Sequence, residues 1–237
     1  LFVDGVANYL EGFMLPHAQL SHERRRELEA FVADNEANVG RFMGRALRDP
    51  SFWYLSSGNF VCGLHVSFLT VHLPGFVHSC GLPLYVGAGA ISMIGLFNII
   101  GSLTAGELSQ RWKRRELLVG IFAGRAVLMT VFLLSEKTTA TVLIFSAMMG
   151  LLWLSTVPPS LALCARNWGL RWLATIFGMV FVSHQIGGFT GAFLGGIIFD
   201  RTGSYDLMWV IGILAAVFAA VIHMPMRDGP RVQPATA

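Results

Sequence analysis

Charged residues are scarce in this sequence. Asp, Glu, Lys and Arg make up 13% of the 237 residues, and apolar residues make up 54%. The mean hydropathy is +0.60, whereas an ordinary soluble domain has about a quarter charged residues. A chain of this composition needs an apolar solvent for its surface, which a lipid bilayer supplies. The formal net charge of +3 does not indicate nucleic-acid binding, because the location of charges matters more than their sum in a membrane protein.

Cysteine is also rare, and several familiar motifs are missing. The three cysteines, Cys62, Cys80 and Cys164, lie far apart and form no C-x-x-C pair, so neither a disulfide framework nor a zinc site is indicated. No G-x-x-x-x-G-K-[ST] loop occurs, which argues against ATP-driven transport. We therefore expect no metal and no cofactor. Residues 1–20 contain acids but no basic region of a signal peptide, and because the chain starts with Leu1 we expect a fragment or a non-standard start codon.

Long apolar runs are what the sequence has instead. About 20 such residues cross a bilayer as a helix, and continuous rather than alternating runs favour helices over barrel strands. The sequence predicts an all-α membrane protein with six transmembrane helices at Phe52–Val77, Leu84–Leu108, Glu116–Leu134, Thr138–Ala162, Ala174–Phe199 and Tyr205–Val221.

The positive charges predict how these spans are oriented. Fourteen Lys and Arg residues lie on one side of the predicted membrane, and only Lys137 and Arg201 lie in loops on the other side. By the positive-inside rule, both termini are expected in the cytoplasm. The fourteen are Arg24, Arg25, Arg26, Arg41, Arg45, Arg48, Arg111, Lys113, Arg114, Arg115, Arg166, Arg171, Arg227 and Arg231.

An amphipathic segment precedes the first span. Residues 21–49 carry apolar side chains at helical spacing, with arginines and acids between them. We favour a solvated helix in a cytoplasmic loop over a helix lying on the lipid surface, because acids are interspersed with the arginines. Asp49-Pro50 should end this helix, since a residue before proline avoids the α conformation.

The loop between the second and third spans carries a family resemblance. The stretch from Gly106 to Arg115, GELSQRWKRR, resembles the major facilitator superfamily signature Gly-x-Leu-x-Asp-Arg-x-Gly-Arg-Arg, a gating loop in that family. Gly106 and the three arginines Arg111, Arg114 and Arg115 fit, whereas Gln110 stands at the usual Asp and Lys113 at the usual Gly. The charge relay in which that Asp normally takes part is therefore in doubt here.

Further motifs resemble the monocarboxylate-transporter-like branch of bacterial facilitators. They are Phe60–Val66, His72–Pro74, Ser183–Gly187 and Asp200–Asp206.

This resemblance implies half of a major facilitator fold, with helices 7 to 12 of twelve in a bacterial inner membrane. Residues 1–50 would be the central cytoplasmic loop, 51–226 the bundle and 227–237 a cytoplasmic tail. The partner would be a missing N-terminal six-helix half or a second copy of the chain.

The same resemblance implies an absence in the second span. Monocarboxylate carriers place an Asp, and an Arg four residues later, where this sequence has Asn98 and Ser102. Proton-coupled lactate transport is therefore not assumed.

Arg125 is the sharpest polar feature within the predicted spans. It lies at the middle of the third span, where an Arg facing lipid would cost roughly 3 kcal/mol. No acid lies at a similar depth, so its partner would be a substrate carboxylate, a group in a missing half, or backbone. We favour a structural pairing over substrate binding.

Other polar residues suggest a cavity. His65 is central in the first span, and His184 and Gln185 are central in the fifth. Such residues at membrane depth either bind solute or form interhelical hydrogen bonds. Together with Asn98, Ser102 and Trp153, we predict that they line a solute cavity; for Trp153, a packing role is equally open.

Glycine and proline positions predict where helices pack closely and where one bends. Gly187, Gly191 and Gly195 repeat every four residues, a spacing that allows close helix approach. Pro158-Pro159 should kink or loosen the fourth span, as a gate or as a static bend.

We expect a secondary transporter, not an enzyme, that moves a small organic solute by alternating access, with organic anions as one candidate class and a proton or ion as a candidate coupling partner. A non-transporting half-bundle that assembles with a partner is the alternative. A membrane redox or metal protein using Cys62, His65, His72 and His184 is a weaker one.

Overall fold

The computed structural model describes residues 38–229. The chain divides into two compact units, Leu1–Arg48 and Asp49–Ala237. In the first unit, residues 38–47 are helical. This helix ends before Asp49-Pro50, as predicted; residues 21–37 of the predicted amphipathic segment lie outside the described residues.

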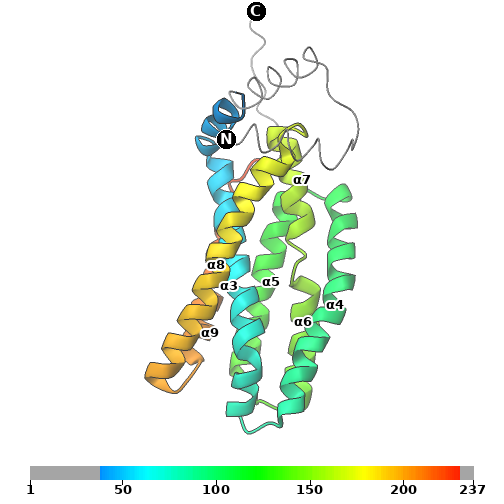
Figure 1. Ribbon diagram of the computed structural model, residues 1–237. Helices are drawn as coiled ribbons and strands as arrows, with labels where there is room; N and C mark the ends of the chain where they lie inside the picture. Colours follow the sequence, from blue (N-terminus) through cyan, green and yellow to red (C-terminus); the bar gives the residue numbers. More distant parts are fainter. Residues whose placement is uncertain (1–37, 230–237) are drawn as a thin grey trace, which may run out of the picture. The chain divides into compact units, whose positions relative to one another are not determined.

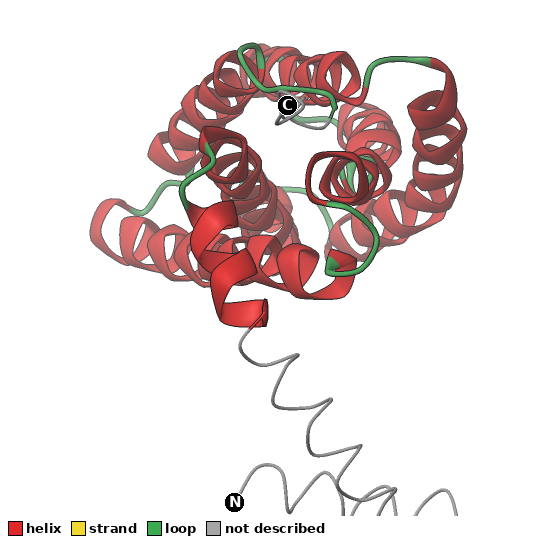
Figure 2. Cartoon of the chain, turned by 90° about the horizontal axis from the view of Figure 1, so that it is seen from above, coloured by secondary structure: helices red, strands yellow, loops and turns green. Residues whose placement is uncertain are grey.

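The second unit is a helical bundle with six candidate membrane spans, which confirms the predicted number (Figure 1). Viewed end-on in Figure 2, the spans run alongside one another. Among residues 49–229 all regular structure is helical. The helices are α3 Pro50–Ser79, α4 Leu84–Arg111, α5 Arg114–Leu134, α6 Thr139–Leu152, α7 Val157–Trp168, α8 Leu173–Thr202 and α9 Asp206–His223.

Short polar motifs fix where these helices begin and end. Asp49 caps α3 by accepting a hydrogen bond from the Ser51 amide at 3.0 Å, and Thr138 forms a reciprocal capping box with Thr141 at the start of α6. These side chains satisfy amides that a helix start leaves unpaired. Gly203 ends α8 in the left-handed conformation, with φ 71°, which glycine adopts without steric cost.

α3 packs most extensively against α8, through glycines. A methyl group added at Gly187 would lie 1.9 Å from the carbonyl oxygen of Phe60, and one at Gly191 would lie 2.2 Å from that of Leu64. The two backbones therefore approach as closely as glycine alone permits, as the four-residue repeat predicted.

An aromatic cluster fills the bundle between α3, α5, α6 and α9. Trp209 is fully buried, with its ring 5.2 Å from those of Phe76 and Phe132 and 5.7 Å from that of Phe145. Phe132 and Phe145 stack at 4.0 Å. Since aromatic pairs add to the energy of burial, this cluster fixes the relative positions of four helices.

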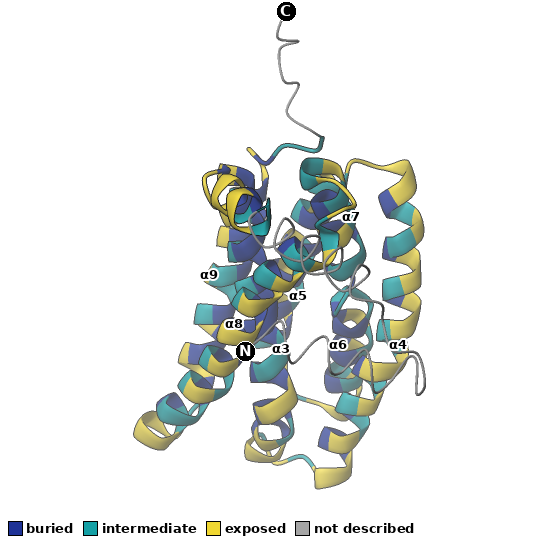
Figure 3. Cartoon of the chain, turned by 45° about the horizontal axis from the view of Figure 1, so that its top comes forward, coloured by how far each residue is buried: buried dark blue, intermediate teal, exposed yellow. Residues whose placement is uncertain are grey.

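The outer surfaces of α4 and α8 are strongly apolar. Of the 18 residues in the most apolar stretch of each helix, only 28% are buried within the protein in α4 and 22% in α8. Figure 3 shows exposed residues along both helices. Leu103 on α4 and Phe189 on α8 are about 70% exposed. Apolar faces of this size need lipid or another protein surface, so the protein is an integral membrane protein.

Candidate functional site at an interrupted helix

The fourth span is interrupted near its middle. α6 ends at Leu152, α7 begins at Val157, and residues 153–156 form bends and turns. Pro158 and Pro159 lie in the first turn of α7; neither has an amide hydrogen to bond one turn back, and their rings crowd the preceding backbone. The kink predicted from this pair is confirmed, in the form of a helix break.

Arg125 on α5 binds the backbone exposed by the break. Its Nη2 donates to the carbonyl oxygen of Leu152 at 2.6 Å, its Nε donates to the same oxygen at 3.2 Å, and Nη2 also donates to the carbonyl of Trp153. The side chain is 1% exposed, and its guanidinium lies 5.3 Å from the centre of the Phe122 ring. The predicted partners of Arg125 were a substrate carboxylate, a group in a missing half, or backbone, and this structure shows backbone carbonyls.

Asn98 on α4 binds the break from another direction. Its side-chain oxygen accepts a hydrogen bond from the Leu154 amide at 3.1 Å and one from the Ser102 hydroxyl at 3.2 Å. Both side chains are half-buried. Asn98 and Ser102 thus form a hydrogen-bonded pair that supports the unwound backbone.

α3 supplies the third set of contacts with the break. The Cys62 thiol lies 3.3 Å from the Thr156 hydroxyl and accepts a weak hydrogen bond from Arg125 Nη2 at 3.6 Å. Trp153, the C-terminal cap of α6, is buried at 8% exposure. The break is therefore held by side chains from three other helices, an arrangement that favours one defined unwound geometry.

The predicted cavity residues divide between the break and other places. Asn98, Ser102 and Trp153 lie at the break. His184 on α8 is buried at 8% exposure and stacks on Phe181 with ring centres 4.9 Å apart. It also interacts with the Cys62 thiol, which itself contacts the break. The neighbouring Gln185 is exposed.

Two histidines of α3, His65 and His72, instead join that helix to its neighbours. His65 is 1% exposed, and its Nε2 lies 2.9 Å from the carbonyl oxygen of Gly212 on α9. His72 makes the same kind of contact with Ala192 on α8, also at 2.9 Å. A carbonyl only accepts hydrogen bonds, so each ring donates through Nε2–H and serves as an interhelical link in this structure.

The signature stretch Gly106–Arg115 lies at the end of the bundle that we call the basic end, where α3 and α5 begin and α4, α7 and α9 end. The prediction that it forms a loop is wrong for most of its length, because residues 106–111 form the last turns of α4 and residues 114–115 begin α5, so only Trp112 and Lys113 connect the two helices. Gly106 is half-buried and Gln110 is exposed. Arg111 pairs on the surface with Glu107 at 2.7 Å, and Arg115 Nη1 donates to the carbonyl oxygen of Met226 at 3.5 Å.

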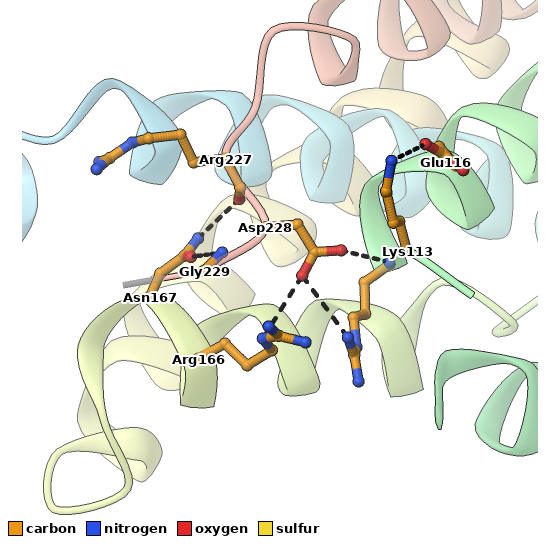
Figure 4. Close-up of polar contacts among 8 residues, drawn as sticks. Lys113, Glu116, Arg166, Asn167, Arg227, Asp228 and Gly229 are labelled. Carbon is orange, nitrogen blue, oxygen red and sulfur yellow. Dashed lines mark hydrogen bonds and ion pairs between the residues drawn. The ribbon is translucent and has the colours of Figure 1, made fainter. Parts of the chain in front are cut away.

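A charge cluster that sequence reasoning missed forms around Asp228 (Figure 4). Its carboxylate accepts a hydrogen bond from the Arg114 amide at 2.7 Å and lies 3.8 Å from the Arg114 guanidinium and 3.7 Å from that of Arg166. Next to it, Arg227 Nη2 donates hydrogen bonds to both carboxylate oxygens of Asp49, at 2.7 and 2.6 Å. Asp228 follows the last span among residues predicted as a tail, and its only sequence signal is that it is one of a few acids at an end rich in arginine.

Comparison with known proteins decides the family. A model of the Major Facilitator Superfamily matches residues 12–192. The chain belongs to the Major Facilitator Superfamily. It is also similar to YcxA of Bacillus subtilis (strain 168), an uncharacterized MFS-type transporter, with 26% identity over 172 residues. That match covers 70% of this chain and 42% of YcxA, so the chain spans less than half the length of this relative.

Membership of the Major Facilitator Superfamily agrees with the six-helix bundle and points to transport rather than catalysis. The monocarboxylate-transporter-like branch stays a prediction. On the redox and metal alternative, no three His, Cys, Asp or Glu side chains among residues 38–229 lie together so that they could hold a metal ion.

Proposed function

We propose that this chain forms one six-helix half of a secondary transporter that moves a small organic solute by alternating access. The observation that carries the proposal is the interrupted fourth span, because transporter binding sites are typically built where a helix is unwound at membrane depth. Polar side chains from α3, α4 and α5 already meet at that point.

The same geometry bears on the class of solute. Arg125 is the only charged side chain near mid-span among the described helices, and its guanidinium is directed at backbone carbonyls. We therefore propose that this half contributes hydrogen-bonding groups, from Asn98, Ser102, His184 and Gln185. If the solute is an organic anion, the cation that binds it comes from the rest of the transporter.

We further propose that the apolar faces of α4 and α8 meet the N-terminal six-helix half, or a second copy of this chain, and lipid beyond it. The support is their low burial within this unit and the length of YcxA, of which the match covers 42%. With the positive-inside rule, the basic end would face the cytoplasm of a bacterial inner membrane.

The test is uptake into cells that express the complete reading frame containing this chain, using a panel of labelled carboxylates, sugars and amino acids. For a solute that is taken up, His184→Ala should lower uptake at least several-fold while the amount of protein in the membrane is unchanged. The control is Ile186→Ala on the same helix, at an exposed apolar position. Uptake that is equal in wild type and His184→Ala would remove His184 from the site, and no uptake of any solute by wild type would favour the non-transporting half-bundle.

A further inference from the structure

The short helix α7 is attached differently at its two ends. At its start, residues 153–156 separate it from α6, so no continuous helix transmits rigidity across the break. At its end, Arg166 and Asn167 contact the segment Met224–Gly229, which follows α9 and which we call the clasp. A helix with an unwound segment at one end depends on its other contacts for its position.

Asn167 makes two hydrogen bonds with the clasp. Its side-chain amide donates to the carbonyl oxygen of Arg227 at 3.2 Å, and its side-chain oxygen accepts from the Gly229 amide at 3.0 Å. Arg166 adds the charge contact with Asp228 at 3.7 Å. Three contacts from two consecutive residues of α7 therefore converge on three consecutive residues of the clasp, as Figure 4 shows.

The clasp is in turn fixed to the rest of the bundle. Asp228 binds the first amide of α5 and the Arg114 guanidinium, and Arg227 binds Asp49 at the start of α3. The side chains of Asp228 and Asp49 are 10% and 9% exposed. Removing one partner of such a pair is costly, because the remaining charge is left shielded from water without its counter-ion.

We propose that Asp228 is a positioning residue that holds the basic end of α7 against the start of α5. Breaking its contacts would free α7 to move about the unwound residues 153–156 while α3, α5 and α9 keep their packing.

A native thiol on α7 reports this movement. Cys164 is fully buried and lies two residues before Arg166, so alkylation by N-ethylmaleimide requires α7 to move away. Cys80, beyond α3 at the opposite end of the bundle, serves as an internal reference. Peptide mass spectrometry of the full chain in lipid nanodiscs gives the alkylation rate at each cysteine separately.

Asp228→Asn should raise the alkylation rate of Cys164 by about tenfold relative to Cys80, because buried charge-assisted contacts that restrain local opening are lost. Asp228→Glu should restore most of the protection. The matched control is Glu116→Gln, which neutralises an acid at the same end whose ion pairs, with Lys113 and Arg115, do not involve α7.

An unchanged Cys164 rate in Asp228→Asn, or an equal rise in Glu116→Gln, would overturn the proposal. If Asp228→Asn raises the rates at all cysteines together through global unfolding, Arg166→Gln decides. Arg166 is 45% exposed, so its loss is mild, and it should raise the rate at Cys164 alone; a variant that folds without that rise would also overturn the proposal. The readout is independent of transport, so it can fail while the proposed function holds.

Discussion

Arg125 illustrates how a buried charge is accommodated in this bundle without an acid beside it. A helix break leaves carbonyl oxygens without amide partners, and a guanidinium with several donors in one plane can bind two of them at once. Here the carbonyls of Leu152 and Trp153 serve as the partners. Charge and break therefore stabilise each other, and neither is favourable at membrane depth alone.

Replacing Arg125 tests this mutual dependence. Arg125→Met keeps the length of the apolar stem but removes the donors to Leu152 and Trp153, so the free energy of unfolding should fall by about 2–4 kcal/mol. The loss would appear as a lower melting temperature in detergent, followed by size-exclusion chromatography after heating. Arg201→Met, at an exposed position near the end of α8, is the control and should melt like wild type. Equal melting of Arg125→Met and wild type would mean that the break is held by Asn98 and Cys62 alone.

Residue-scale prediction from sequence succeeded where chain-local properties decide and failed where a neighbouring helix decides. The depth of Arg125 follows from counting along an apolar run. Its partners do not, because they are backbone atoms of another span. His65 likewise has a predictable depth, but its link to Gly212 depends on how α3 is rotated against α9.

At the scale of elements, glycine spacing governs the closest contact in the bundle. The α3–α8 pair relies on positions where a side chain would meet backbone atoms, which cannot rotate out of the way. The sequence repeat was sufficient to predict close packing but did not identify α3 as the partner. That choice depends on which helix offers a flat complementary surface, and Gly63, against the carbonyl oxygen of His184, provides part of it.

The same helix contains a matched pair of glycines for testing this packing. Gly187→Ala places a methyl group 1.9 Å from the Phe60 carbonyl oxygen, so α3 and α8 must separate, at a cost of about 1–3 kcal/mol. Gly178→Ala, with no atom within 4 Å of the added methyl group, should be neutral or slightly stabilising because alanine favours helix. Melting temperatures of the two variants make the comparison. A stable Gly187→Ala protein would show that the helix pair has room to adjust.

At the scale of the whole molecule, hydropathy was sufficient for the number of spans, because the membrane imposes length and polarity on each of them. Hydropathy could not predict the clasp, because residues 224–229 are too short and too polar to count as a span. Their contacts arise only because α3 and α5 begin nearby and α7 ends nearby. Nothing in the sequence pairs Asp49 with Arg227, because the two residues are 178 positions apart.

Cys80 provides a test of orientation for the whole protein. Its thiol lies at the end opposite the basic one, so a membrane-impermeant maleimide added to intact cells should label Cys80 but not a cysteine placed at the exposed Arg111. The reverse pattern would invert the proposed topology.

The pH dependence of Cys80 labelling should follow the pKa of its thiol. Partial burial raises the pKa of the Cys80 thiol, with Lys137 acting in the opposite direction. Since the thiolate is the reacting form, labelling should be slower than for a free cysteine at neutral pH. Its rate should keep rising above about pH 8.5, the ordinary pKa of the group. A rate that levels off below that pH would contradict the burial seen here.

The pair between Asp49 and Arg227 has a consequence for biosynthesis. One partner precedes the first helix of the bundle and the other follows the last. The ribosome therefore synthesises Asp49 long before Arg227, and these two residues can pair only after all six spans have been made. A chain truncated before α9 would lack this pair, so its formation depends on synthesis of the whole bundle.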